Sequence, residues 1–146
     1  MTESNNPLGL VHLAATTLYV RDLDAAVAWY REMLGLEPVV MGRDQHGYAA
    51  YQLGPSILVL EPVEAALEPQ EPGSESATVN LVIDRDPAAV REELMRRGVT
   101  CGRIVPSPNF HSFLMRDLDG NRFYVTKPVT AEAQEQLETT VADAQR

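Results

Sequence analysis

Residues 16–39 read TTLYVRDLDAAVAWYREMLGLEPV, and residues 79–102 read VNLVIDRDPAAVREELMRRGVTCG. A shift of 63 positions places Leu18 on Leu81, Val20 on Ile83 and Gly35 on Gly98. In each copy an apolar run is followed by apolar residues at helical spacing and then by a glycine, which indicates a strand, a helix and a helix stop. The repeat therefore predicts two copies of one structural module in a single chain.

Three further strands are expected after each helix, because short apolar runs alternate there with turn-rich segments. The predicted elements of the first module are a strand at 10–20, a helix at 24–34 and strands at 37–41, 48–53 and 57–61. Those of the second are a strand at 77–83, a helix at 87–97 and strands at 101–105, 110–116 and 122–126. The pattern predicts an α+β fold of two tandem βαβββ modules that form a concave mixed sheet.

The same reading divides the chain into one domain and a tail. We expect a single domain at residues 8–129, with module one at about 10–62 and module two at about 77–128. The segment 62–76 is rich in proline and glutamate, which predicts a linker over the surface. Residues 130–146 are predicted to form a C-terminal helix whose apolar stripe consists of Ala133, Leu137, Val141 and Ala144. That stripe fits a partner subunit and fits a loosely packed tail equally well.

Composition and charge exclude several classes of function. The 146 residues are 45% apolar and 23% charged, with a net charge of −9. Such an acidic surface repels phosphate backbones, so we expect no nucleic-acid partner; a cationic small molecule is weakly favoured. No run approaches the roughly 20 apolar residues of a membrane span, and the N-terminus lacks the pattern of a secretory signal. Cys101 is the lone cysteine, so a cytoplasmic location is the simplest expectation.

Two motifs carry a family resemblance. LYVRDLDAAVAWYREMLGLEPV at 18–39 and FLMRDLDGNRFYV at 113–125 resemble the vicinal oxygen chelate superfamily. That superfamily includes glyoxalase I, extradiol dioxygenases, and fosfomycin- and bleomycin-resistance proteins. The resemblance covers roughly residues 10–127 and implies the glyoxalase/bleomycin-resistance fold, in which two modules enclose a cup. Leu118 departs from the pattern, because the family usually has proline in a DPDGN turn.

The resemblance also implies where a metal would be bound. Metal-dependent members take a His or Gln from the first strand of each module and a Glu from the last strand of each. Those positions fall at Ala15, Thr78 and Tyr124, and at Val59 or Glu61, of which the uniform shift of 63 selects Glu61. A catalytic Zn²⁺ or Fe²⁺ needs about three converging protein ligands. This set does not supply them, so we expect the ancestral metal site to be lost and no cofactor to be bound.

The three histidines do not restore a metal site. His12 alternates onto the strand face opposite to position 15, and His46 falls in a predicted turn. His111 begins a strand and is expected to face away from the cup, unless the preceding Pro106-Ser107-Pro108 segment twists it inward. No pair of these histidines has the spacing of a metal motif.

Strand alternation and the resemblance together predict the residues that face the cup. One of Tyr48 and Tyr51, which lie on opposite faces of their strand, is expected among them. The predicted ligand-binding residues are Ala15, Thr17, Tyr19, Tyr48, Tyr51, Val59, Thr78, Asn80, Phe110, Ser112, Leu114 and Arg122. The predicted acid or base residues are Tyr124, Glu61 and His111. Arg122 could equally pair with an acidic neighbour, Tyr124 could be a core aromatic, and Glu61 could be a solvated carboxylate.

Three functions remain open from the sequence. The first is a metal-free protein of the bleomycin-resistance type that sequesters an antibiotic or natural product, and the resemblance implies a homodimer with shared clefts. The second is a cofactor-independent enzyme, an isomerase, lyase or cyclase, that uses Tyr124, Glu61 or His111 as acid or base. The third is a metal-dependent glyoxalase- or dioxygenase-like enzyme with relocated ligands. Whether the chain is an enzyme is therefore undecided at this level.

Overall fold

A computed structural model describes residues 7–43, 46–73 and 78–144. Module one contains β1 (Thr16–Val20), α1 (Leu23–Trp29) with a π-helical continuation η1 (Tyr30–Leu34), β2 (Val40–Gly42), β3 (Tyr48–Leu53), β4 (Ser56–Pro62) and the short 3₁₀ turn η2 (Val63–Ala65). Module two contains β5 (Val79–Val82), α2 (Pro87–Arg96), β6 (Thr100–Cys101), β7 (Val105–Pro106), β8 (Phe110–Arg116) and β9 (Arg122–Pro128), and it is followed by α3 (Ala131–Ala144). The predicted α+β class and C-terminal helix are confirmed.

Local signals set the ends of the two helices in the repeat. The Asp22 side chain accepts a hydrogen bond from the Ala25 amide at 3.0 Å, which caps the start of α1. Gly35 ends the helical stretch with a φ of 68°, a left-handed conformation that costs glycine little. In the second module Asp86 caps α2 and Pro87 occupies its first turn. The repeated sequence pattern therefore produces the same strand-to-helix unit twice.

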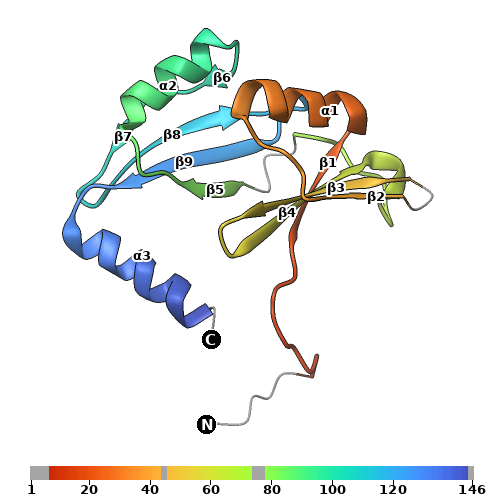
Figure 1. Ribbon diagram of the computed structural model, residues 1–146, viewed down its shortest axis with the longest axis horizontal. Coiled ribbons are helices and arrows are strands. Elements are labelled where there is room, and N and C mark those ends of the chain that lie inside the picture. Colours follow the sequence, from red (N-terminus) through yellow and green to blue (C-terminus); the bar gives the residue numbers. More distant parts are fainter. Residues whose placement is uncertain (1–6, 44–45, 74–77, 145–146) are drawn as a thin grey trace.

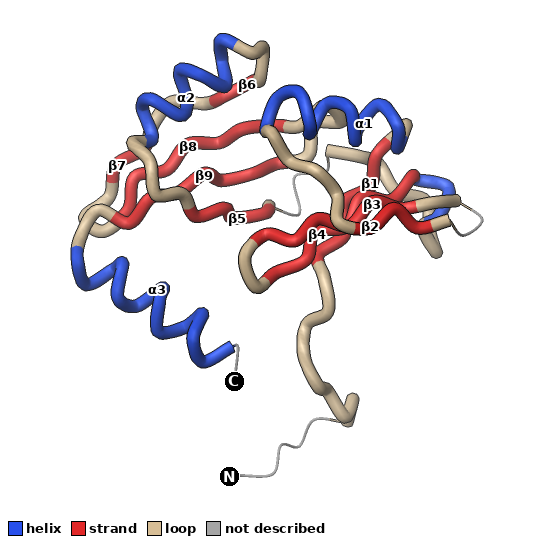
Figure 2. Tube along the Cα trace, in the orientation of Figure 1, coloured by secondary structure: helices blue, strands red, loops and turns tan. Residues whose placement is uncertain are grey.

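The strands form two sheets with the same topology. The first sheet has the order β1-β4-β3-β2 and the second β5-β9-β8-β6, with β7 paired to β8. In each sheet the first strand of the module runs parallel to its last strand. Each module contributes one mixed sheet, and among the described residues no ladder joins the two sheets. In Figures 1 and 2, α1 and α2 lie on one side of the sheets, while α3 and residues 7–15 lie on the other.

The helix side of both sheets forms the core. Leu18, Val20 and Leu60 are buried beneath the helices in module one, and Phe113 and Val125 are buried in module two. All of these residues belong to one cluster, which the ring of Tyr30 helps to join. The Tyr30 ring centroid lies 5.5 Å from that of Tyr51 and 6.3 Å from that of Phe123. Neither module buries its apolar face alone, because the packing crosses from one module to the other.

A buried polar contact fastens the two modules to each other. The Tyr30 hydroxyl donates to Oδ2 of Asp117 at 2.6 Å. The Asn121 side-chain amide donates to the same carboxylate oxygen at 3.0 Å and to the backbone carbonyl of Tyr19 at 3.1 Å. The Arg21 amide donates to Asp119 Oδ1 at 2.9 Å. Residues 117–121, here called the Asp117 turn, therefore join β8 and β9 to both β1 and η1.

Burial and hydrogen bonding act in opposite directions on Asp117. Burial raises the pKa of its carboxyl group, while hydrogen bonds from Tyr30 and Asn121 lower that pKa, and the net shift is upward. Burial, and then the charge of Asp117, raises the pKa of Tyr30 well above the usual value for tyrosine. Leu118, which replaces the family's usual proline, is exposed. The turn keeps its hydrogen bonds without that proline, because they come from the flanking residues.

Several predicted boundaries differ from the structure. β1 begins at Thr16 instead of residue 10, and no ladder includes residues 7–15. The strand predicted at 37–41 lies at Val40–Gly42, and the one predicted at 101–105 is divided between β6 and β7. In α3, Ala133 is buried, whereas the side chains of the other stripe residues fall outside the described part. No helix in the described residues is long and apolar enough to cross a membrane.

We predict that Tyr30→Phe lowers the free energy of unfolding by about 1.5–3 kcal/mol, because a buried carboxylate loses a hydroxyl donor. Urea denaturation measures the change. Tyr51→Phe is the matched control: the Tyr51 hydroxyl is buried in the same core with no hydrogen-bond partner, so its removal should leave stability unchanged or increase it. Equal losses in the two variants would contradict the assigned role of the Tyr30–Asp117 bond.

The raised pKa of Asp117 predicts a pH dependence of stability. The folded state binds this proton more tightly than the unfolded state, so the contribution is present at low pH and is lost as pH rises through the folded pKa. Asp117→Asn abolishes this titration. Relative to that variant, the wild-type protein should therefore lose unfolding free energy as pH rises from about 4 to about 7. Urea titrations of both proteins across this range test the sign, and a rising difference would refute the assignment.

Candidate functional site

The sheet face away from α1 and α2, here called the open face, is the candidate site. In module one, Thr17 and Tyr19 of β1 pair with Val59 and Glu61 of β4. The intervening residues Leu18 and Leu60 are buried on the helix side, so alternation assigns these four residues to the open face. Each of the four is half-buried or exposed.

Module two presents the same arrangement. Asn80 of β5 pairs with Tyr124 of β9, which pairs in turn with Leu114 of β8. Their neighbours Phe123, Val125 and Phe113 are buried on the helix side, which assigns the paired residues to the open face. The predicted residues that alternation brings to the open face are Thr17, Tyr19, Tyr48, Val59, Glu61, Asn80, Phe110, Ser112, Leu114, Arg122 and Tyr124. Ala15 and Thr78 immediately precede β1 and β5.

Two predicted residues lie on the opposite face. Tyr51 is 1% exposed and packs on the helix side, where burial raises the pKa of its hydroxyl to about 12. His111 pairs with Lys127 and Pro106, and its strand position alternates with Ser112 toward the side of Phe113. The twist that would have turned His111 inward is absent. Of the two tyrosines on β3, Tyr48 is therefore the one on the open face.

The ladder register corrects the position that we assigned to the first-module glutamate. Thr17 and Asn80 are equivalent in the repeat, and they pair with Val59 and Tyr124 respectively. The residue equivalent to Tyr124 is therefore Val59, whereas Glu61 corresponds to Thr126. The uniform shift of 63 selected Glu61 because it does not allow for a two-residue difference between the modules before their last strands.

With this register, the family resemblance implies four positions for metal ligands in the chain. They hold Ala15, Thr78, Val59 and Tyr124, which offer one aliphatic hydroxyl and one phenol as donors. Zn²⁺ and Fe²⁺ prefer imidazole, thiolate and carboxylate ligands. Within residues 7–43, 46–73 and 78–144, no three His, Cys, Asp or Glu side chains group closely enough to hold an ion. The residues present do not fit the family's metal.

The open face of module two is polar and aromatic. The Arg122 Nη2 donates to the Tyr124 hydroxyl at 3.3 Å, and the guanidinium carbon lies 5.9 Å from the Tyr124 ring centroid. The Ser112 and Thr126 hydroxyls are 2.9 Å apart and share a hydrogen bond. Arg116, which pairs with Arg122, was missing from the predicted set, although alternation on β8 could have found it.

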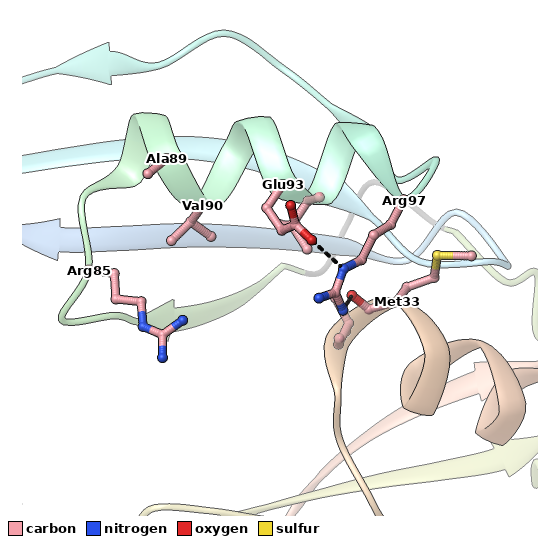
Figure 3. Close-up of a pocket in the computed structure, with 8 residues that line it drawn as sticks. Met33, Arg85, Ala89, Val90, Glu93 and Arg97 are labelled. Carbon is pink, nitrogen blue, oxygen red and sulfur yellow. Dashed lines mark hydrogen bonds and ion pairs between the residues drawn. The ribbon is translucent and has the colours of Figure 1, made fainter.

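A separate hollow of about 280 Å³ lies on the helix side, between the two modules (Figure 3). Met33 and Leu34 of η1 and Val90 and Leu94 of α2 form its apolar wall. Arg97 closes one end, because its guanidinium donates to the Met33 carbonyl at 3.3 Å and to Glu93 at 3.0 Å. We interpret this hollow as part of the interface between the two modules, since its residues pack the end of η1 against α2.

Comparison with known proteins gives a family match along most of the chain. The model of a family described as "Glyoxalase/Bleomycin resistance protein/Dioxygenase superfamily" matches residues 9–125. No curated protein sequence matches the chain significantly.

Solved structures show the same fold at low sequence identity. A member of this superfamily from Sphaerobacter thermophilus is 21% identical, with a TM-score of 0.70 over 82% of this chain and 99% of that one. A glyoxylase/bleomycin resistance protein/dioxygenase domain from a Frankia species is also 21% identical, with a TM-score of 0.65 over 82% and 99%. TnmS3, an antibiotic binding protein from a Streptomyces species, is 22% identical, with a TM-score of 0.67 over 83% and 98%.

We predict that Gly42→Ala disturbs Tyr48 on the open face. A Cβ at position 42 would lie 1.8 Å from Cε1 of Tyr48, so the ring would have to leave its place. Such overpacking should lower the free energy of unfolding by about 1–3 kcal/mol, as measured by urea denaturation. Gly102→Ala is the control, because its nearest contact would be an ordinary 3.6 Å from Leu114. Equal effects of the two substitutions would contradict the packing of Tyr48 on Gly42.

Proposed function

The chain belongs to the Glyoxalase/Bleomycin resistance protein/Dioxygenase superfamily, and on this premise we propose that it is a metal-independent protein that binds a small molecule on its open face. The observation that carries the proposal is the set of residues at the family's metal positions. Ala15, Thr78, Val59 and Tyr124 leave the fold of a metalloenzyme without the ligands of one. A binding role requires only a shaped surface with a few polar anchors.

The side chains of the open face favour a ligand with flat, partly polar chemistry. Tyr19, Tyr48, Phe110 and Tyr124 offer aromatic surface, and Asn80 adds a side-chain amide. Aromatic side chains provide large contact areas and stacking surfaces for flat ligands. The similarity to TnmS3, which is an antibiotic binding protein, supports an antibiotic or natural product as the ligand class. The protein would then protect the cell by sequestering this compound, without making or breaking a covalent bond.

A homodimer is part of this proposal. Large apolar side chains are exposed along residues 8–13, at 39–41 and on β5, which is unusual for a surface that faces only water. Many oligomers of soluble proteins are two-fold symmetric, and a self-complementary surface of this kind suits such a pair.

The contact between Arg122 and Tyr124 favours a second candidate function. The Arg122 guanidinium donates to the Tyr124 hydroxyl at 3.3 Å and holds that hydroxyl on the open face, where Tyr124 could exchange a proton with a bound substrate. Glu61 lies beside Tyr19 on the open face and could act as a second acid or base. His111 is less suited to this role, because its strand position faces the helix side. The enzyme would be a cofactor-independent isomerase, lyase or cyclase.

We predict that an aromatic natural product bound on the open face stabilises the protein, by about 2.7 kcal/mol at a ligand concentration of 100 times Kd. Thermal unfolding against a panel of such compounds, followed by calorimetry, identifies the ligand. Tyr124→Ala should then weaken binding about 10- to 100-fold, because it removes aromatic contact area. Met95→Ala, an exposed change on α2, is the control. Equal affinities of the two variants would place the ligand elsewhere.

Product analysis separates the binder from the enzyme. The binder returns its ligand unchanged, and Tyr124→Phe keeps its affinity within a few-fold, since the ring remains. The enzyme returns an altered compound, and Tyr124→Phe loses turnover while it retains binding. Stoichiometric metal in the purified protein, with binding abolished by a chelator, would overturn the metal-independent proposal in both forms and favour relocated ligands.

A further inference from the structure

The hollow on the helix side lies across the sheets from the open face and has room for a small organic molecule. Its volume is about 280 Å³, and η1 of module one, α2 of module two and the loop before α2 enclose it (Figure 3). A protein cavity of about 150 Å³ is known to hold benzene, so this hollow has space for a compound of roughly twice that size.

The wall of the hollow suits an alkyl group. Met33 and Leu34 come from the end of η1, and Val90 and Leu94 lie one turn apart on α2. All four side chains are aliphatic or thioether groups, which pack on a flexible alkyl chain and offer no ring for stacking. Ala89 completes the apolar lining, and its short, exposed side chain leaves that side of the hollow open to solvent.

Two of the three charged residues of the lining are paired with each other. The Glu93 carboxylate accepts hydrogen bonds from Arg97 at 3.0 Å and from Arg96. The Arg97 guanidinium also donates to the backbone carbonyls of Met33 and Glu32, at 3.3 and 3.4 Å. These contacts join α2 to η1 at one end of the hollow, so the donors of Arg97 are used within the protein.

Arg85 is the third charged residue of the lining, and it lies at the end of the hollow opposite Arg97 (Figure 3). Within the described part of the chain, its guanidinium forms no ion pair and no hydrogen bond. Asp84 and Asp86 flank it in the sequence without pairing with it. The Asp86 carboxylate instead accepts from the Ala88 amide at 3.4 Å, as the cap of α2.

An arginine that pairs with none of the described residues, at the end of an apolar wall, points to an anionic ligand. The chain has 21 Asp and Glu residues against 12 Lys and Arg residues, so acidic partners are not scarce. A guanidinium presents its N–H donors in a planar fork that matches the two oxygens of a carboxylate. Arg85 therefore supplies the charge, and the wall supplies the apolar contact, for one amphipathic molecule.

We propose that the hollow is a second binding site, which takes a small amphipathic anion with an alkyl body and a carboxylate. The alkyl body packs on the apolar wall, and the carboxylate accepts hydrogen bonds from Arg85. Such a ligand contacts η1 of one module and α2 of the other, so it stabilises their packing. The site is separate from the open face, and the inference does not depend on the function proposed for that face.

Octanoate is the probe for this site, and 1-octanol, which has the same chain without the charge, is its control. Calorimetry should show that the wild-type protein binds octanoate at least about 10-fold more tightly than 1-octanol, and that Arg85→Gln removes this preference, because a charge-assisted hydrogen bond is lost. Arg103→Gln, an exposed change outside the lining, should retain it. A wild-type protein that does not bind octanoate, or an Arg85→Gln variant with the wild-type preference, would overturn the proposal.

Methionine methyl spectra locate the bound octanoate. In protein labelled with ¹³C at the methionine methyl groups, the Met33 signal should shift during titration, because Met33 lines the hollow. The signals of Met41 on β2 and of Met95, which is exposed on α2 outside the lining, should stay in place. Shifts confined to Met41 or Met95 would place octanoate elsewhere and refute the site.

Filling the hollow gives a second, independent check. Ala89→Phe places a ring in the lining and should abolish both octanoate binding and the Met33 shift. Ala88→Phe is the matched control, because Ala88 is the exposed neighbour that does not line the hollow, and it should preserve both. Cooperative thermal unfolding of each variant shows that it is folded. Octanoate binding that survives Ala89→Phe unchanged would contradict the proposed site.

Discussion

The hydrogen bond between the Tyr30 hydroxyl and the Asp117 carboxylate holds the rest of the structure in place. It joins a helix of the first module to a turn of the second across 87 residues of sequence, in a setting that excludes water. The same carboxylate receives the Asn121 side chain and the amides of Asp119 and Asn121. Burying a carboxylate costs free energy unless its oxygens are hydrogen-bonded. The loss of any one of these donors therefore weakens the whole network. The two sheets share no ladder among the described residues, and this contact and the aromatic core beneath it keep their relative position.

The Tyr30–Asp117 contact and the core lie on the helix side of the sheets, so the open face of each sheet is left for function. The helices and the aromatic core occupy the opposite face, so open-face side chains can change without loss of the core. The positions that hold metal ligands in related enzymes have changed in this way, to Ala15, Thr78, Val59 and Tyr124. The chain therefore has the family's fold with residues that do not fit the family's metal, which is why function has to be argued from the site.

The sequence by itself determined the duplicated module, its helix caps, and the face of most strands, because these depend on local residue spacing and on a period of two along each strand. Alternation alone assigns Leu18 to the core and Thr17 to the open face. Only the tertiary structure decided that Val59, and not Glu61, is the counterpart of Tyr124. A shift of the last strand by two residues keeps every side chain on the same face of the sheet, so the apolar pattern of the sequence does not reveal it. The register is fixed only by pairing with a strand that is distant in the sequence. For the same reason the side of Tyr51 and the start of β1 at Thr16 could not be inferred, since both depend on another part of the chain.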